Sequence, residues 1–469
     1  MNKKNKALEL TLVGGAVLLV IGLLILGVKA IQKPQQELPP QTEEDTVPQQ
    51  EQSSEEIQTE EVPEIQEEKP QQEKPTVTKP TTNTPQNKPT PPVQEKPTPS
   101  PPPAPTPQPI LPKPTPSTLS GNQIVGYYAY WGNSKGFPPS ALRADLLTHI
   151  NYAFATIDKD FKIAMANPSA DKQNFAELRE LKAANPHLKT LISIGGWDYS
   201  GRFSDAALSE LSRETFAQSC LDFILIHGFD GIDLDWEYPV SGGLPGKKRP
   251  EDKQNYTKLL AAIRTKLNEQ SDKDGKKYLL TIAGAPSNDF INKIEAKKIA
   301  SLVDYIFIMG YDMHGPWDSY ADLTAPLYLP QENSPHYKLS VESSVNIYLS
   351  AGVPAKKLIL GMPFYGYSYQ VNSSDNDGLY STFSGGKSVG YDTVKNNYLN
   401  SSDYEQFYHS NAEVPYLFGN NTFVSFEDKA SIAAKANLAK DYGLGGVGAW
   451  ELSHDTGATL LKAAYNALN

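Results

Sequence analysis

The sequence predicts an α/β protein: a (β/α)8 barrel with a small α+β insertion between strands seven and eight, preceded by a membrane anchor and a disordered Pro-rich stalk. Three observations support this prediction. All 25 Tyr, 16 Phe and 5 Trp lie at Tyr127 or beyond, so an aromatic core can form only in the C-terminal part. Eight short apolar runs alternate there with helical patterns. The chain before them is first apolar and then rich in proline.

Residues 1–30 are expected to form a cytoplasmic tip and a membrane-spanning anchor. Lys3, Lys4 and Lys6 precede an uncharged run over 10–28, and a helix of that length rises about 28 Å, which matches a bilayer core. Positive charge ahead of the span predicts an N-terminus inside the cell and the rest outside. A buried core helix is one alternative, and secretion after cleavage at Ala30 is another. The length of the run favours the uncleaved anchor.

Residues 31–118 are expected to be a disordered linker. They contain no aromatic residue, are rich in Pro, Glu and Thr, and repeat Lys-Pro-Thr between Lys74 and Lys113. Such a segment cannot bury enough apolar surface to fold alone, and it favours extended polyproline II conformations. Fully extended at about 3.1 Å per residue, it would span on the order of 270 Å. It would hold the domain formed by 119–469 away from a membrane.

Composition also excludes several classes of function. The single cysteine, Cys220, rules out an intrachain disulfide framework and a multi-thiolate metal site, and we expect it to be a packing residue. The formal net charge of −11 argues against binding to nucleic acid. We therefore expect no cofactor, no metal and no obligate partner, and a monomer.

The domain over 119–469 contains eight candidate strands separated by helical patterns, among them 206–227 and 252–268, and it closes with a helical pattern over 457–468. The candidate strands are 123–130, 148–155, 189–194, 231–236, 278–283, 305–310, 358–362 and 446–450. Eight strands in about 350 residues favour a (β/α)8 barrel, and the alternative is a doubly wound open sheet.

The last two candidate strands are separated by roughly 80 residues, far more than one helix needs. We expect 366–426 to form a small α+β subdomain that walls one side of the cleft, followed by the last barrel helix at 428–442. A long disordered loop is the alternative, but the many aromatic residues in this segment argue against it.

The residues best suited to chemistry lie between Asp230 and Glu237. Side chains alternate along a strand, so Asp233, Asp235 and Glu237 share one face, while Trp236 points to the other face and is expected in the core. Carboxylates about 6 to 7 Å apart in a low-dielectric interior cannot all ionise freely, so at least one must hold a proton near neutral pH. A general acid requires such a proton, and Glu237 lies nearest the C-terminal rim.

Two other interpretations of this acidic row are possible. A row paired with Lys or Arg would need basic residues in the neighbouring strands, which carry almost none. A divalent cation would need six or more oxygens, normally from several strands. Asp230 is expected to point to the opposite face of the strand from Asp233, Asp235 and Glu237. For Asp230 a structural role and a catalytic role remain equally open.

At these residues the sequence resembles glycoside hydrolase family 18, the chitinases, whose signature D-G-x-D-x-D-x-E ends the fourth barrel strand. Residues 230–237 match that signature in full. The resemblance covers 123–469 and includes the inserted subdomain, which is similar to that of the deep-cleft bacterial-type branch. Further matching motifs are Ser-Ile-Gly-Gly-Trp at 193–197, Met-Gly-Tyr-Asp at 309–312, Gly-Met-Pro-Phe-Tyr-Gly at 361–366 and Gly-Ala-Trp at 448–450.

The resemblance implies extracellular hydrolysis of β-1,4-linked N-acetylglucosamine polymers by a retaining mechanism without an enzyme nucleophile. Glu237 would be the general acid and base. Asp235 would hold the substrate's acetamido N–H, and Asp233 would share a proton with Asp235. By the same resemblance Tyr311 would bind the acetamido oxygen, and Asp312 would support the distorted sugar.

Aromatic residues are expected to bind the sugar faces, which are apolar and stack on flat side chains. Trp450 resembles the floor beneath the sugar that is cleaved, and Met309 would line the pocket for the acetyl methyl. Trp131, Trp197 and Trp317 end or follow strands one, three and six at the catalytic rim, and Tyr127 and Phe154 are further residues expected to bind substrate.

Two residues, Tyr367 and His314, need separate comment in the comparison with the family. Many relatives have Arg after Phe-Tyr-Gly where this chain has Tyr367, which leaves one sugar contact open. His314 follows the strand-six motif, and we expect a hydrogen-bonding residue at the rim rather than a catalytic base. Two further functions remain open: a surface N-acetylglucosaminidase that acts on peptidoglycan or glycoprotein glycans, and a non-catalytic chitin-binding lectin.

Overall fold

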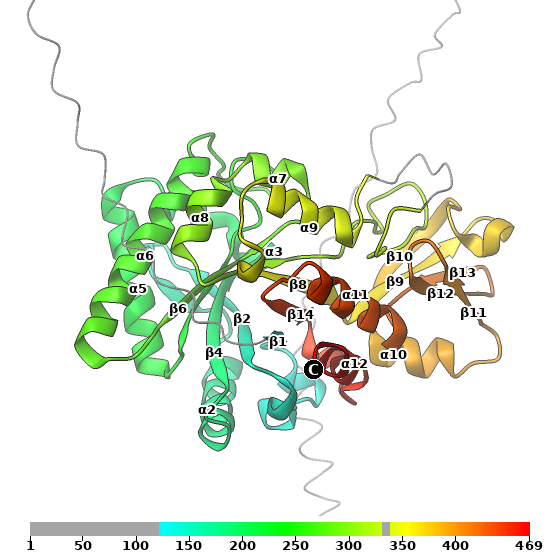
Figure 1. Cartoon of the computed structure of the whole chain (residues 1–469), viewed down its shortest axis with the longest axis horizontal. Helices are drawn as coiled ribbons and strands as arrows, with labels where there is room; N and C mark the ends of the chain where they lie inside the picture. Colours follow the sequence, from blue (N-terminus) through cyan, green and yellow to red (C-terminus); the bar gives the residue numbers. More distant parts are fainter. Residues whose placement is uncertain (1–121, 331–337) are drawn as a thin grey trace, which may run out of the picture. The chain divides into compact units, whose positions relative to one another are not determined.

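The computed structural model describes residues 122–330 and 338–469 (Figure 1). The expected anchor at 1–30 and the expected linker at 31–118 lie outside these residues. Among the helices within the two described stretches, none combines the length and the apolar character needed to cross a bilayer.

Eight parallel strands form a closed barrel. The sheet runs in the order β1-β14-β8-β7-β6-β5-β4-β2, and pairing of β1 with both β2 and β14 closes it. The short β3 (Ile163–Met165) adds antiparallel to β2. The barrel strands are β1 (Gln123–Ala129), β2 (His149–Ile157), β4 (Lys189–Gly195), β5 (Gly231–Asp235), β6 (Leu279–Gly284), β7 (Tyr305–Ile308), β8 (Leu358–Pro363) and β14 (Gly446–Trp450). The predicted barrel is confirmed, and the closed order excludes a doubly wound open sheet.

Helices follow most of the barrel strands and pack outside them (Figure 1). The longer ones are α2 (Pro168–Ala184), α5 (Glu210–His227), α6 (Asp252–Asp274), α8 (Ala296–Leu302), α9 (Val341–Ser350), α11 (Lys429–Asp441) and α12 (Thr459–Leu468). Short helices α3 (Gly196–Tyr199), α4 (Phe203–Ala206) and α7 (Asn288–Asn292) lie in the loops. The strands are buried on both faces, which explains their nearly continuous apolar sequences.

The helix expected over 206–227 begins later than predicted, at Glu210. Ser209 caps it: its side chain accepts a hydrogen bond from the Ser212 backbone N–H, and the Ser212 side chain accepts one from the Ser209 N–H. This capping box satisfies backbone donors that a longer helix would have had to bond internally. Gly228 ends the helix in the left-handed region, with φ of 78°.

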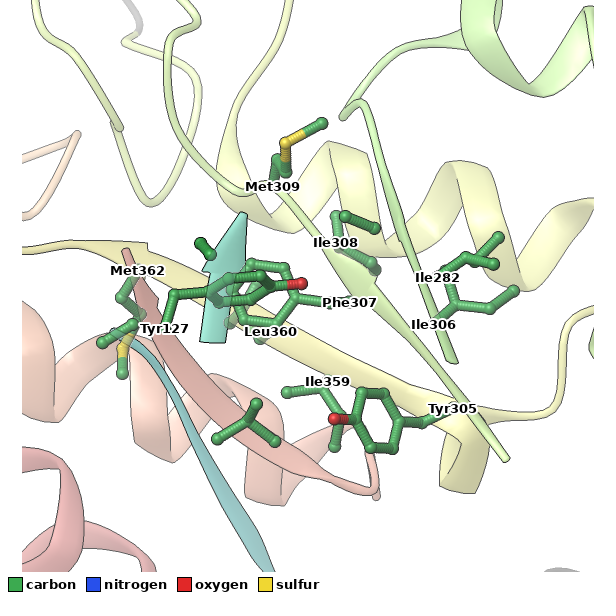
Figure 2. Close-up of a cluster of buried hydrophobic side chains, with 14 of the residues drawn as sticks. Tyr127, Ile282, Tyr305, Ile306, Phe307, Ile308, Met309, Ile359, Leu360 and Met362 are labelled. Atoms are coloured by element: carbon green, nitrogen blue, oxygen red, sulfur yellow. The ribbon is translucent and has the colours of Figure 1, made fainter. Parts of the chain in front are cut away.

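The core fills the barrel interior with large side chains (Figure 2). The rings of Tyr127 and Phe307 meet edge to face with centroids 4.9 Å apart. Trp236 stacks on Phe203 outside the barrel, with ring centroids 5.3 Å apart. This agrees with the prediction that its side chain points to the opposite face of the strand from the carboxylates. Cys220 is fully buried on α5, in agreement with a packing role.

A second, antiparallel sheet lies between β8 and β14 in the sequence, in the order β10-β9-β13-β12-β11. Figure 1 shows it on the opposite side of the barrel from α5 and α6. A small apolar cluster that includes Val389, Leu417 and Val424 supports it. Its elements are β9 (Tyr365–Val371), β10 (Phe383–Gly390), α10 (Tyr391–Val394), β11 (Glu405–His409), β12 (Val414–Gly419) and β13 (Thr422–Ser425).

Candidate active site

Asp233 is the deepest of the three carboxylates on β5 and is fully buried. It accepts hydrogen bonds from the hydroxyls of Tyr127 at 2.8 Å, Ser193 at 2.8 Å and Thr281 at 2.6 Å, which come from β1, β4 and β6. Burial raises the pKa of Asp233, and the three hydroxyl donors oppose that rise. Asp233 is therefore a supporting group beneath the cavity.

Tyr127 was expected to line the sugar site, and the structure corrects this prediction. Its ring is 1% exposed and its hydroxyl bonds to Asp233, one layer below the cavity. Strand alternation directs the residue into the barrel, but its position along β1 places its hydroxyl against Asp233, and Tyr127 is not among the described residues that line the cavity.

Asp235 lies one step nearer the rim and is also buried. Burial raises its pKa well above the usual value, and the charges of Glu237 and Asp233 raise it further. Its Oδ1 atom has no hydrogen-bond partner among the described residues. Asp235 therefore lines the cavity beside Glu237 and has one carboxylate oxygen that the described residues leave without a partner.

Glu237 follows the end of β5 and faces the cavity. Its backbone N–H donates to the Ser200 hydroxyl at 2.8 Å, and that hydroxyl donates to the Gly196 carbonyl oxygen at 2.8 Å. Burial raises the pKa of Glu237 to about 7, helped by the charges of Asp312 and Asp198 and opposed by a hydrogen bond from Tyr238. A carboxyl group with this pKa can both give and take a proton near neutral pH.

The Gly-Gly pair at the end of β4 allows the chain to turn close to these carboxylates. Gly195 has φ of 106° and Gly196 has φ of 70°, backbone conformations that favour glycine. A Cβ at Gly195 would lie 2.2 Å from the Asp235 carbonyl oxygen, and one at Gly196 would lie 2.5 Å from the Phe154 ring. The motif is therefore explained by close packing around the site.

The carboxylates open into a cavity of about 570 Å³ at the C-terminal end of the barrel. Ten of the residues expected at the site line it: Trp131, Phe154, Trp197, Asp235, Glu237, Met309, Tyr311, Asp312, Trp317 and Trp450. Six further lining residues were not placed in the site beforehand: Tyr130, Asp198, Tyr199, Tyr238, Pro286 and Tyr367. Asp198, Tyr199 and Tyr238 directly follow the Gly-Gly-Trp and carboxylate motifs, so adjacency could have identified them.

Trp450 forms one wall of the cavity. It stacks on Phe154 with ring centroids 5.5 Å apart and an interplanar angle of 28°, and it meets Trp131 edge to face at 6.4 Å. Trp197 and Trp317 are 50% and 61% exposed, although they line the cavity. Exposed rings at the rim of a cavity are available to stack on a ligand.

Asp312 is held by two tyrosines from β9. The hydroxyls of Tyr365 and Tyr367 both donate to its Oδ1, the latter at 2.9 Å. Burial raises the pKa of Asp312, and these two hydrogen bonds lower it. Tyr367, which stands where many relatives have Arg, thus buttresses Asp312 and also lines the cavity.

Asp230 and His314 lie outside the row of carboxylates formed by Asp233, Asp235 and Glu237. Asp230 accepts from Lys182 at 2.9 Å and from the Thr190 N–H at 2.8 Å, at the opposite end of β5 from Glu237, which favours its structural role. It lines a separate cavity of about 800 Å³ there, which lacks Asp235 and Glu237. His314 is buried, with Nδ1 3.2 Å from Asp318. Among residues 122–330 and 338–469, no cluster of His, Cys, Asp and Glu is arranged to hold a metal.

Comparison with known proteins agrees with this arrangement. Residues 123–455 match the family model of the glycosyl hydrolases family 18. Chitinase A1 of Niallia circulans is 39% identical over 412 residues, which cover 74% of this chain and 58% of that protein. Chitotriosidase-1 of Mus musculus is 35% identical over an alignment that covers 72% of this chain and 74% of that protein.

Solved structures are similar as well. Chitinase ChiA74 from Bacillus thuringiensis superimposes with a TM-score of 0.71 at 34% identity, covering 74% of this chain and 70% of that one. A family 18 N-acetylglucosaminidase from Paenibacillus barengoltzii superimposes with a TM-score of 0.68 at 33% identity, covering 74% of this chain and all of the other.

Proposed function

Because the chain belongs to the glycosyl hydrolases family 18, we propose that it is a glycosidase that hydrolyses β-1,4-linked N-acetylglucosamine polymers, chitin and its oligosaccharides. The observation that supports this most strongly is the pairing of Glu237, whose pKa is raised to about 7, with the buried acceptor of Asp235 in one aromatic-lined cavity. The named relatives that are chitinases support the choice of substrate.

In the first step Glu237 acts as the general acid. Its carboxyl proton passes to the glycosidic oxygen as the bond from that oxygen to the anomeric carbon breaks. The electron pair of that bond stays with the departing oxygen, which leaves as a hydroxyl. Glu237 is then an anion, next to the charge that develops on the sugar.

The nucleophile is the substrate's own 2-acetamido carbonyl oxygen, which bonds to the anomeric carbon and forms a cyclic oxazolinium ion. Asp235, which lines the cavity beside Glu237, accepts the acetamido N–H, and negative charge on its carboxylate stabilises the cation. Asp233 shares a proton with Asp235, because two carboxylates this close cannot both ionise freely.

In the second step the Glu237 carboxylate takes a proton from water, and the water oxygen attacks the anomeric carbon. The acetamido group is released unchanged. Each step inverts the anomeric carbon, so the product keeps the β configuration. Glu237 ends the cycle protonated, as it began.

Other lining residues position the sugar. Tyr311 donates its hydroxyl to the acetamido oxygen, and Met309 packs beside the acetyl methyl. Asp312, which is held by hydrogen bonds from Tyr365 and Tyr367, accepts hydrogen bonds from hydroxyl groups of the distorted sugar ring. Trp450 stacks beneath that ring, because its apolar C–H face matches an aromatic surface.

Turnover of 4-methylumbelliferyl conjugates of chitobiose and chitotriose tests this function. Glu237→Gln nearly preserves the shape of the side chain but removes the transferable proton. Because the same group serves in both steps, we expect turnover to fall by several orders of magnitude, at about 10²- to 10⁴-fold for each proton transfer. Oligosaccharide binding should survive. Activity of the variant within about tenfold of wild type would contradict the assignment.

Matched 2-acetamido and 2-hydroxyl substrates test the mechanism separately. A 2-hydroxyl sugar lacks the reacting carbonyl, so its bond should be inert, and proton NMR of fresh acetamido products should show the β-anomer. Comparable rates on both substrates would instead indicate a covalent glycosyl-enzyme formed by Asp235.

A second candidate function is an N-acetylglucosaminidase acting on peptidoglycan or glycoprotein glycans. The similarity to the Paenibacillus enzyme favours it specifically. Product analysis on chitin oligomers, peptidoglycan and N-glycans side by side distinguishes the two. Binding without turnover on all three would leave the lectin function.

The proposal includes a location outside the cell, on a single-pass anchor with the N-terminus inside, supported by the charge pattern of residues 1–30. A monomer suffices, because every proposed site residue lies within 127–450. Surface labelling of whole cells with an antibody to the barrel checks the location.

A further inference from the structure

Tyr367 on β9 belongs to two parts of the cavity at once. Its hydroxyl donates to Asp312 Oδ1 at 2.9 Å, and its ring meets the ring of Trp317 edge to face with centroids 5.6 Å apart. Tyr365 also bonds to Asp312, but it is not among the described residues that line the cavity, whereas Tyr367 is. One side chain therefore connects a hydrogen-bonding carboxylate with an aromatic surface.

The ring of Trp317 also lies against its own loop. A Cβ at Gly315 would lie 2.2 Å from this ring, so only a residue without a side chain fits beneath it. The loop in turn packs on the antiparallel sheet, because a Cβ at Gly386 of β10 would lie 3.0 Å from the side chain of Pro316. Trp317 thus combines an exposed surface, on which a sugar can stack, with contacts to Gly315 and Tyr367.

The position of Asp312 depends on β9. Asp312 follows the end of β7 and has φ of 57°, in the left-handed region that residues with a side chain rarely adopt. Among the described residues, the hydrogen bonds to its carboxylate come from Tyr365 and Tyr367, and both reach Oδ1. A movement of Tyr367 therefore changes one of the two bonds that orient this carboxylate.

We propose that Tyr367 is a positioning residue that couples the binding of a sugar at Trp317 to the orientation of Asp312. This inference rests on the proposed function, in which Asp312 supports the distorted sugar. A sugar stacked on Trp317 restricts that ring against Tyr367, and the Tyr367 hydroxyl then holds Asp312 in the orientation that the distorted sugar needs. Binding energy from a sugar remote from the scissile bond is thereby used at the reacting centre.

The coupling predicts how chain length affects the two kinetic constants. A substrate long enough to reach Trp317 is turned over faster as well as bound more tightly, because the additional contact acts on the transition state through Asp312. A surface that only binds the sugar would lower KM and leave kcat unchanged. The dependence of kcat on length is therefore the property that distinguishes coupling from simple stacking.

Steady-state kinetics on N-acetylglucosamine oligomers from trimer to hexamer test the proposal, with kcat and KM measured separately at each length. Tyr367→Phe keeps the ring and removes the hydroxyl, whereas Tyr367→Leu removes both. Trp317→Ala removes the stacking surface. The matched control is Tyr408→Phe, which removes an exposed hydroxyl on β11 outside the cavity.

We expect the kcat of wild type to rise and its KM to fall with oligomer length. Y367F should keep the fall in KM but lose most of the rise in kcat, a loss of about threefold to tenfold on the hexamer, as removal of one hydrogen bond predicts. Y367L and W317A should lose both trends, and Y408F should keep both. In the W317A background, Y367F should no longer change the dependence of kcat on length.

Two results would overturn the coupling. If Y367F lowers kcat by the same factor at every length, the hydroxyl supports Asp312 without a connection to Trp317. If the kcat of wild type does not depend on length, no binding energy reaches Asp312 from the aromatic surface.

Failure of the proposed function would be recognised separately. If wild type hydrolyses none of the oligomers, that function is wrong, and isothermal titration calorimetry then measures their binding to the same variants. Losses of hexamer affinity in W317A and Y367F that are non-additive in the double variant would support the connection between the two residues. Additive losses would overturn it.

Discussion

The three carboxylates of β5 have the same chemistry but three different environments. Asp233 is surrounded by hydroxyl donors, Asp235 has an unpartnered oxygen, and Glu237 lines the cavity. Each position along β5 meets different side chains from the neighbouring strands, and these neighbours cause the differences. Position along the strand therefore decides whether a carboxylate is a supporting group or a group that can exchange protons with a ligand.

The pH dependence of activity should follow Glu237. The acid form is needed for the first step, so kcat/KM on short chitin oligomers should fall as the pH rises through about 7. Asp198 raises the pKa of Glu237 by its negative charge. Asp198→Asn should therefore move the alkaline limb of the pH profile to lower pH. Asp272→Asn, which changes an exposed carboxylate on α6 outside the cavity, should leave the limb in place. A limb that moves upward in D198N would refute this account.

The same residue predicts a pH-dependent stability. Folding raises the pKa of Glu237 from 4.5 to about 7, so the folded chain binds more protons than the unfolded chain between those values. Stability is therefore lost as the pH rises across this window. Glu237→Gln cannot ionise, so its unfolding temperature should exceed that of wild type by a few degrees near pH 8 and match it near pH 4. A difference that stays constant with pH would count against this explanation.

At the scale of elements, a buried ion pair fixes the chain where it returns from the antiparallel sheet to the barrel. Lys435 on α11 donates to both oxygens of Glu427 at 2.8 Å, and the two side chains are 0% and 2% exposed. Glu427 follows β13 by two residues. The pair therefore orients α11 relative to the end of the insertion.

Removal of one partner should be costly. Lys435→Met leaves the Glu427 carboxylate buried without its cation, and we expect a loss of about 3 to 5 kcal/mol in the free energy of unfolding. Replacement of both groups, in Lys435→Met with Glu427→Leu, should recover much of that loss. Urea titration measures both variants. A double variant no more stable than the single one would show that packing, rather than the unpaired charge, causes the loss.

The sequence allowed many of the elements to be predicted because their signals are local. Strand alternation predicted the shared face of Asp233, Asp235 and Glu237, and opposite parity predicted the buried Trp236. Depth within the barrel is not a local property, which is why Tyr127 was expected at the sugar but bonds to Asp233 below the cavity instead. Asp198 and Tyr238 were missed because their position in the cavity depends on turns that follow β4 and β5.

At the scale of the whole molecule, the described residues contain the complete proposed site. Deletion of residues 1–118 should therefore yield a soluble protein with unchanged kcat/KM on short chitin oligomers. Size-exclusion chromatography and the oligomer assay measure these properties, and E237Q in the truncated protein is the inactive control. An aggregated or inactive truncation would show that the N-terminal region contributes to the fold.

The distribution of tryptophan gives the molecule an optical property. Four of its five indoles, those of Trp131, Trp197, Trp317 and Trp450, line the cavity, while Trp236 is packed against Phe203. A sugar that covers the cavity indoles would displace water from them and change their ultraviolet emission, while the emission of Trp236 would stay as a constant background. The protein thus contains its own reporter of occupancy, which remains readable without a label when E237Q binds oligosaccharide but cannot cleave it.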